Sequence, residues 1–452
     1  CKIFKTENIN QFESFLIRSS SDDQMQTMFR DGLAHTLVSD LKVETQAYQP
    51  AVIYINGQYW GIQNLREKYN EAYFEEHYGV IEDNLNVIKN NPSVTDNVEH
   101  GSNSGYLNML SFLSAHSNDK NIYDNMNKQM DIESYIDYMA SQIYLSPDDW
   151  PGNNIRYWRS YTGRYNRWRW VCYDMDQVVR SNNTRWNSIL LATTPYNGNS
   201  WPNPPWSVEL FNNLLKGEKF RNEFLLRIMF LMNTSLSPDH IIHVVDSLHD
   251  KISDEMPFHI QRWGGQLVND PLRESWIQPL PRSMEEWENH VQVMRNFAVS
   301  RPDTAINMLR RYFKLSAAVN ITVKNNDPGK GYLYMGPKKI PGADHHGRYF
   351  AGVPLELNAR PRPGYKFLRW EVSQPGLPLV INESQSFSFY PSKESSVQAW
   401  FGSDTVGTAP VIINEVNYHS SGDADAGDWV ELYNRAAYNV DISGWIMKDE
   451  KD

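Results

Sequence analysis

The chain has 452 residues, which at roughly 100–200 residues per domain allows two to four domains and a sizeable core. Its 54 acidic and 43 basic residues give a net charge of −11, which excludes a broad basic surface for duplex nucleic acid or an anionic membrane. No apolar run approaches the ~20 residues that cross a bilayer, and the two cysteines, Cys1 and Cys172, form neither a disulfide framework nor a Cys-rich zinc pattern.

Residues 1–315 carry the signals of mixed helix and strand. Apolar residues recur at helical spacing over 27–40, and a second helix is expected over 70–78. Between them, Asn56-Gly57 separates two strand-like runs within 51–65 and predicts a β-hairpin. Later helices are expected over 220–232, 238–256, 284–299 and 302–313, which together resemble a helical cap.

The most informative window is 131–179. Asp131 caps a predicted helix that stops before Pro147, and a polar loop over 146–154 follows. Two strands come next, over 155–158 and 168–173, and the second leads directly into Asp174-Met-Asp176.

Beyond residue 315 the chain shows short alternating strands, frequent Gly and Pro, and no amphipathic helix. A β-module is expected over 316–402, a small-residue linker over 403–410, and a second β-module over 411–452. The last piece is too short to fold alone by the usual core arithmetic, so we expect the chain to end inside this module.

Helix, acidic loop, hairpin and acidic strand end is the order in which protein kinases arrange their catalytic machinery. Asp149 and Asn154 reproduce the kinase offset D-x-x-x-x-N, and Asp174 falls where the magnesium-binding aspartate stands. Asp174 and Asp176, two apart on an extended segment, share a face and could hold metal ions together. Phosphoryl transfer needs such a set: one carboxylate for the acceptor hydroxyl and hard oxygen ligands for Mg²⁺.

The opposing interpretation is an ordinary surface loop, since Asp, Asn, Gly and Pro are common in loops and the offset occurs by chance. The G-x-G-x-x-G, H-R-D and Walker motifs are all absent from the sequence. An ordinary kinase is therefore excluded.

Several blocks of the first 315 residues resemble the CotH (spore-coat-H) family of atypical secreted bacterial kinases. The specific ones are the N-G-x-Y-W-G-I block at 56–62 and the D-W-P-G-N-N block at 149–154. Further similar blocks lie at 14–23, 29–33, 170–176 and 295–301, so the resemblance covers about 15–314.

The resemblance implies Asp149 as the catalytic carboxylate, Asn154 and Asp174 as metal ligands, and Asp176 as a second acidic ligand. The phosphates of a nucleotide also need cations, and the cluster Arg66-Glu67-Lys68 after the hairpin is a candidate, with Glu67 orienting a basic side chain. An exposed charge cluster at a helix start is the alternative for these three residues.

Arg18 and Arg30 are further candidates for phosphate contacts, with surface solvation as the alternative. The chain begins after most of the N-terminal β-rich segment that family members carry, which leaves Lys2 and Lys5 as remnants. The continuation 177–180 also lacks the glycine-containing pattern usual in the family. A degenerate kinase is therefore a second interpretation.

The module at 316–402 resembles internalin-type B-repeats through 364–370 and 397–401, which implies a β-grasp-like spacer or adhesive unit. The tail resembles the start of a lamin-tail domain, an immunoglobulin-like sandwich, through 412–416, 429–434 and 442–445. Both resemblances imply export to an extracellular, cell-surface or periplasmic setting, and lipidation is one interpretation of Cys1.

Three other patterns each have a structural interpretation beside a functional one. His240 and His243 stand three apart on a predicted helix, but no further ligand completes a metal set. His345-His346 falls in a Gly-rich loop, where a solvated loop is the simpler interpretation. The Trp- and Pro-rich stretch at 200–206 fits either sugar stacking or packing on the cap.

The sequence thus predicts an α+β chain: an atypical protein-kinase-like domain with a helical cap over 1–315, then two small β-modules. Its expected activity is transfer of the ATP γ-phosphate to protein Ser or Thr with Mg²⁺ or Mn²⁺, with no nucleic-acid partner. The alternative is an inactive kinase-like scaffold of a surface protein that binds a glycan or a protein.

Overall fold

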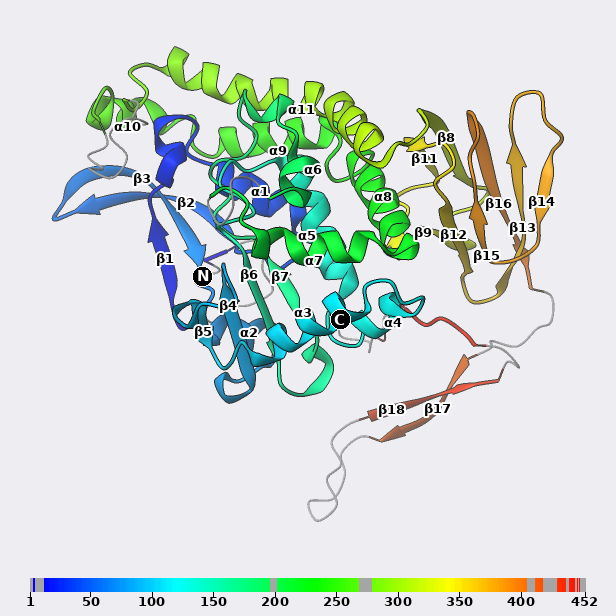
Figure 1. Ribbon diagram of the computed structural model, residues 1–452. Coiled ribbons are helices and arrows are strands. Elements are labelled where there is room, and N and C mark those ends of the chain that lie inside the picture. The colour runs from blue at the N-terminus through cyan, green and yellow to red at the C-terminus, as the bar shows by residue number, and fades with distance from the viewer. Residues whose placement is uncertain are drawn as a thin grey trace. The chain divides into compact units, whose positions relative to one another are not determined.

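A computed structural model describes residues 3–4, 12–195, 201–267, 279–404, 411–417, 429–435, 439–443, 445 and 447. The chain divides into two compact units, Cys1–Ser316 and Ala317–Asp452, and each is described by itself. The described residues combine several small sheets with eleven α-helices, which confirms the mixed α+β class (Figure 1).

The first sheet has three antiparallel strands in the order β1-β3-β2: β1 (Phe15–Arg18), β2 (Tyr48–Ile55) and β3 (Gln58–Glu67). The turn between β2 and β3 is Asn56-Gly57, and both residues have positive φ, 51° and 77°. Two-residue hairpins favour Asn-Gly because the turn that matches the strand twist needs positive φ at both positions. The predicted hairpin is confirmed, and its second strand carries Arg66.

The second sheet is antiparallel in the order β5-β4-β6-β7: β4 (Leu85–Lys89), β5 (Val98–His100), β6 (Arg156–Ser160) and β7 (Arg169–Val171). Strands β6 and β7 are the hairpin expected after the polar loop. Val87, Trp158 and Val171 are fully buried in one core with Phe74. This core fixes the end of β7, from which the acidic segment 174–176 departs.

Most helices of the first unit pack together beside the sheets (Figure 1). They are α1 (Arg30–Val38), α2 (Glu71–Tyr78), α3 (Ser104–His116), α4 (Ile122–Met126), α5 (Ile132–Leu145), α6 (Ser188–Thr193), α7 (Pro205–Leu215), α8 (Glu218–Met232), α9 (Pro238–Asp250), α10 (Met256–Trp263) and α11 (Met284–Phe313). Asp131 caps α5 by accepting a hydrogen bond from Ser134 N, as predicted.

Two helix boundaries differ from the prediction. The helix expected over 238–256 is two helices, because α9 ends at Asp250 and α10 begins at Met256. The helices expected over 284–299 and 302–313 are one helix, α11, with Pro302 inside it. A proline removes one intrahelical hydrogen bond, but α11 continues across that position and packs against α9, α6 and the segment Asn183–Arg185.

The second unit holds a four-stranded sheet β10-β9-β12-β15, a five-stranded sheet β11-β8-β16-β13-β14 and a hairpin β17–β18. The strands are β8 (Ala318–Asn325), β9 (Gly331–Met335), β10 (Lys338–Lys339), β11 (Asp344–Phe350), β12 (Leu355–Pro361), β13 (Tyr365–Ser373), β14 (Val380–Asn382), β15 (Ser386–Phe389), β16 (Ser395–Ser403), β17 (Val411–Asn417) and β18 (Trp429–Asn434). Burial alternates along β9 and β16, as expected for strands with one buried face. Among the described residues, no helix has both the length and the apolarity that crossing a bilayer requires.

Candidate active site

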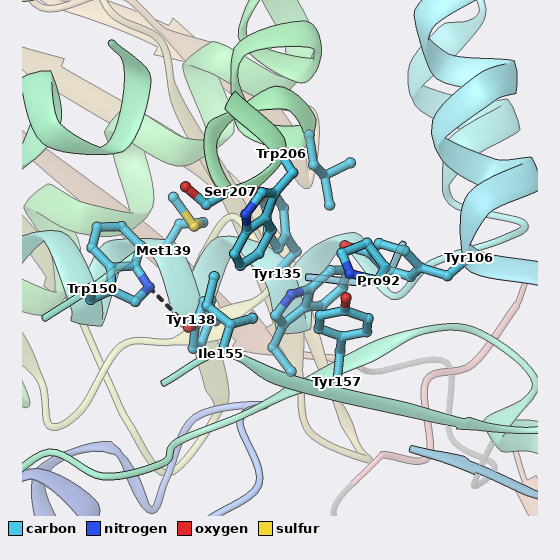
Figure 2. A pocket seen from close by; sticks show the side chains of 12 residues that line it. Pro92, Tyr106, Tyr135, Tyr138, Met139, Trp150, Ile155, Tyr157, Trp206 and Ser207 are labelled. Atoms are coloured by element: carbon cyan, nitrogen blue, oxygen red, sulfur yellow. Dashed lines mark hydrogen bonds between the residues drawn. The ribbon is translucent and has the colours of Figure 1, made fainter. Parts of the chain in front are cut away.

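The polar loop after α5 is held in place from both sides. Trp150 is fully buried, and its indole Nε1 donates a hydrogen bond to the hydroxyl of Tyr138 at 3.0 Å, inside the aromatic pocket of Figure 2. Gly152 N donates to the carbonyl of Pro202 at 2.6 Å, where an added Cβ would lie only 2.5 Å from that oxygen. The buried indole and the close contact at Gly152 fix the backbone around Asp149.

Asp149 and Asn154 meet across this loop. Asn154 adopts a left-handed conformation, with φ of 57°, which asparagine tolerates better than most residues. Its Nδ2 donates to Asp149 Oδ2 at 2.6 Å and lies 3.4 Å from the carbonyl oxygen of Asp174. Asp149 Oδ1 is buried and has no hydrogen-bond partner among the described residues. Buried polar atoms are nearly always paired, so an unpaired carboxylate oxygen needs an explanation, and a missing ligand is one.

Asp174 and Asp176 follow β7 and lie together around Arg18, the last residue of β1. The Arg18 guanidinium forms an ion pair with Asp174, and its NH2 lies 3.9 Å from Asp176 Oδ2. Asp176 also accepts a hydrogen bond from Asp22 N at 3.0 Å. The structure therefore brings Asp174 and Asp176 to one place, adjacent to the pair Asp149 and Asn154.

Asp31, on α1, joins this cluster and was not singled out by the sequence as a site residue. Its Oδ1 accepts a hydrogen bond from Met175 N at 2.9 Å, and its Oδ2 lies 3.0 Å from Arg66 NH2 and 3.5 Å from Arg18 NH1. Asp31 thus connects both arginines to the acidic segment. The only sequence signal was its position inside the block at 29–33.

The three charged residues at the end of β3 lie in different surroundings. Arg66 is buried, and its Nε and NH1 have no hydrogen-bond partner among the described residues. Glu67 is also buried, but it accepts from Ala47 N at 2.8 Å and contacts His77 at 2.7 Å, away from the acidic cluster. Lys68 is exposed. Of the three, the structure places only Arg66 beside Asp31.

Arg30, the other arginine candidate, is fully buried and pairs with Asp23 at 2.5 Å. His240 and His243 are exposed on α9, and His345 is buried against the Tyr349 hydroxyl at 2.6 Å. Residues 201–206 pack on the loop through the contact at Gly152, whereas residue 200, Cys1, Lys2 and Lys5 lie outside the described residues.

The carboxyl groups of this site have shifted pKa values. Burial and the charge of Asp174 raise the pKa of Asp149 to about 7. Burial and the charges of Asp174 and Asp31 raise the pKa of Asp176 well above its ordinary value. Against an opposing effect of burial, Arg66 and His35 hold the pKa of Asp31 well below its usual range. A cation bound at the site would favour the charged forms of Asp149 and Asp176, because an opposite charge lowers the pKa of a carboxyl group.

Among the described residues, no three Asp, Glu, His or Cys side chains converge closely enough to hold a metal ion. The positive charge between Asp174 and Asp176 comes from Arg18 instead. The donor set is nevertheless that of a hard cation, because it offers two carboxylates, the Asn154 amide and the unpartnered oxygen of Asp149.

The raised pKa of Asp149 predicts a pH-dependent effect of Asp149→Asn. The folded state binds a proton at Asp149 up to about pH 7, while an unfolded aspartate loses it near pH 4, so this group's contribution to stability falls as pH rises between these values. The neutral variant escapes this loss. We compare the melting temperature of the variant with that of the wild type in EDTA. We expect the variant's advantage to be several degrees larger at pH 8 than at pH 5.

Circular-dichroism melts at the two pH values measure this difference. Asp40→Asn, which removes the same charge from an exposed position after α1, should show a much smaller change between them. An equal effect of Asp149→Asn at pH 5 and pH 8 would contradict the assigned environment of Asp149.

Family models give two matches to the chain. One described as CotH kinase protein matches residues 2–305, and one described as Lamin Tail Domain matches residues 405–452. No curated protein matches the chain with significant similarity.

Proposed function

This chain belongs to the CotH kinase family, and on that premise we propose that it transfers the γ-phosphate of ATP to a serine or threonine hydroxyl of a protein. The observation that carries the proposal is the meeting of Asp149 and Asn154 with Asp174 and Asp176 beside two arginines. These groups come from a loop, a strand end and the first sheet, and together they offer the charges that phosphoryl transfer requires.

Asp149 is the candidate for orienting the acceptor hydroxyl and accepting its proton. Its pKa of about 7 suits a group that must take up a proton near neutral pH. The hydrogen bond from Asn154 holds one carboxylate oxygen and leaves the other available to the hydroxyl.

Asn154, Asp174 and Asp176 are the candidates for holding Mg²⁺ or Mn²⁺. Such an ion would neutralise charge on the ATP phosphates. Asp174 is held near these groups by Arg18, and Asp176 by Asp22 N, so both carboxylates are oriented by the protein itself. The guanidinium of Arg18 lies between the carboxylates of Asp174 and Asp176, which would also attract a metal ion.

Arg66 and Arg18 are the candidates for contacts to the phosphates. Both line one pocket with Ser19, Ser20 and Asn64, and the Nε and NH1 of Arg66 have no hydrogen-bond partner among the described residues. A buried guanidinium with free donors matches the geometry of phosphate oxygens. Glu67 and Lys68 make no described contact with this pocket, so we assign them no direct phosphate contact.

The second candidate function is an inactive kinase-like scaffold of a surface protein. The ion pair between Arg18 and Asp174 favours it, because the arginine competes with a metal ion for that carboxylate. The absence of a converged three-ligand set among the described residues points the same way.

We further propose an exported protein. The lamin-tail match, the B-repeat-like module with an expected β-grasp-like fold, and the expected immunoglobulin-like character of the tail support an extracellular, cell-surface or periplasmic setting. In the first unit, the helices α8 to α11 are the proposed helical cap.

Calorimetric titration with ATP in the presence of Mg²⁺, Mn²⁺ or EDTA tests the kinase proposal, followed by transfer of labelled phosphate to dephosphorylated casein. We expect binding that depends on metal. Arg66→Gln and Lys68→Gln form a matched pair, and only Arg66→Gln should weaken binding, by about tenfold or more. If ATP does not bind with either metal, the scaffold interpretation replaces the kinase.

A further inference from the structure

The outward face of the sheet β10-β9-β12-β15 presents two tyrosines. Along β9, Gly331, Leu333 and Met335 are buried, whereas Tyr332 and Tyr334 alternate with them and are partly exposed. The strand period places both rings on the same side of the sheet, about 6.6–6.8 Å apart along the strand. Neighbouring strands flank the pair, with β10 on one side and β12 on the other.

Three cationic side chains lie over these rings. The Lys339 ammonium is 3.9 Å and the Arg362 guanidinium 4.3 Å from the centre of the Tyr332 ring. The Arg360 guanidinium is 4.0 Å from the centre of the Tyr334 ring. Because the rings hold them, these cations lose less freedom on binding an anion than isolated surface lysines would. We call this set the tyrosine–cation face.

The tyrosine–cation face is hollowed on both sides of Tyr332. One hollow is lined by both tyrosines with Arg360 and Arg362, and the next is lined by Tyr332 with Lys339 and Arg362. Tyr332 and Arg362 line both hollows. The two hollows therefore form neighbouring subsites on one surface, which suits an extended ligand better than a single small molecule.

A carboxylate already occupies one position on this face. Asp441 Oδ2 lies 2.5 Å from Arg360 NH1. Lys339 and Arg362 form no ion pair with an acidic residue in the described part of the chain. The face thus accepts carboxylates and keeps two cations available, although the chain as a whole carries a net charge of −11.

We propose that the tyrosine–cation face binds a linear acidic polysaccharide that carries carboxylates, such as a polyuronate. The arginine forks match the carboxylates, and the tyrosine rings offer apolar surfaces to the sugar rings. A nucleic acid fits less well, because three cations neutralise few of its closely spaced phosphates and the net charge of the chain repels it. This site is independent of the kinase proposal.

Binding of polygalacturonate to the full chain in 50 mM NaCl tests the proposal, with neutral dextran and single-stranded DNA as comparison ligands. We expect polygalacturonate to bind, dextran not to bind, and DNA to bind at least tenfold more weakly. Lys339→Ala/Arg362→Ala should weaken polygalacturonate binding tenfold or more. Lys324→Ala/Lys366→Ala removes the same charge from the other sheet and should change binding less than twofold.

Melting curves of both double variants establish that they fold. Absence of polygalacturonate binding, equal losses in the two double variants, or tighter binding of DNA would each overturn the proposal.

Discussion

Asp174→Asn is expected to abolish metal-dependent ATP binding while the protein stays folded. The change is nearly isosteric and removes one negative charge from the cluster around Arg18. Replacing even outer-shell partners of a metal costs about 10–100-fold in affinity, so loss of a direct ligand should weaken ATP binding with Mn²⁺ by at least about 100-fold. The Asp174 side chain is 31% exposed, and Arg18 keeps Asp31 and Asp176 as partners, so the melting temperature should change by no more than about 3 °C.

Calorimetry with ATP and Mn²⁺ measures the effect, and Asp148→Asn is the matched control. Asp148 lies beside Asp149 in the sequence but contacts Arg180 at 3.5 Å and Asn183, away from Asp174. We expect its variant to bind ATP within about threefold of the wild type. Equal ATP affinity of Asp174→Asn and the wild type would remove Asp174 from the site.

The local part of this site could be predicted from the sequence because its signals are local. The Asp131 cap, the apolar spacing of α5 and the Asn56-Gly57 turn each determine structure within a few residues. Asp149, Asn154 and Asp174 are close in sequence, and the loop followed by a hairpin brings them together in space. Their meeting is a short-range consequence of that order.

The cationic half of the site could not be predicted in this way. Arg18 is separated from Asp174 by 156 residues and Asp31 from Met175 by 144, so no spacing rule connects them. For the cluster at 66–68 the sequence did offer a rule: neighbouring residues on a strand point to opposite faces, so Arg66 and Glu67 could not both face the site. Arg66 and Glu67 on β3 follow that rule, and only Arg66 reaches the acidic cluster.

The helix boundaries show a similar limit. Proline is common at the first position of a helix, so Pro302 predicted the start of a new helix. The structure continues α11 through this position, and the preceding residue, Arg301, is fully buried among groups from distant segments. Packing over the length of α11 therefore outweighs the local preference of proline.

Arg301 is the residue whose loss we expect to cost the most stability. Its Nε and NH2 donate to the carbonyls of Tyr144 and Ile143 at 2.9 and 2.8 Å, in the last turn of α5. NH1 donates to the carbonyls of Asn183 and Trp186, both at 3.0 Å. Helix ends leave such carbonyls unpaired, and here a buried cation satisfies them at the negative end of the helix dipole.

The same contacts lie directly before the candidate active-site loop, since α5 ends at Leu145 and the loop follows. Burial lowers the pKa of Arg301 to about 10, which still leaves it charged at neutral pH. Arg301→Met has similar volume but no donors, so the Tyr144 carbonyl would lose its described hydrogen-bond partner. The carbonyls of Ile143, Asn183 and Trp186 would each keep one other donor and lose the guanidinium. We expect a loss of about 3–5 kcal/mol in the free energy of unfolding.

Urea unfolding followed by circular dichroism measures this loss, and Arg295→Met on the same helix is the matched control. Arg295 pairs with Asp246 at 2.7 Å, but the two side chains are 25% and 47% exposed, and such pairs contribute at most about 1 kcal/mol. Arg301→Lys should recover only part of the loss, because a lysine cannot reach both the end of α5 and the segment 183–188. If Arg301→Met costs no more than Arg295→Met, the carbonyls of α5 are satisfied without this guanidinium, and the position of the loop is set by Trp150 and Gly152 alone.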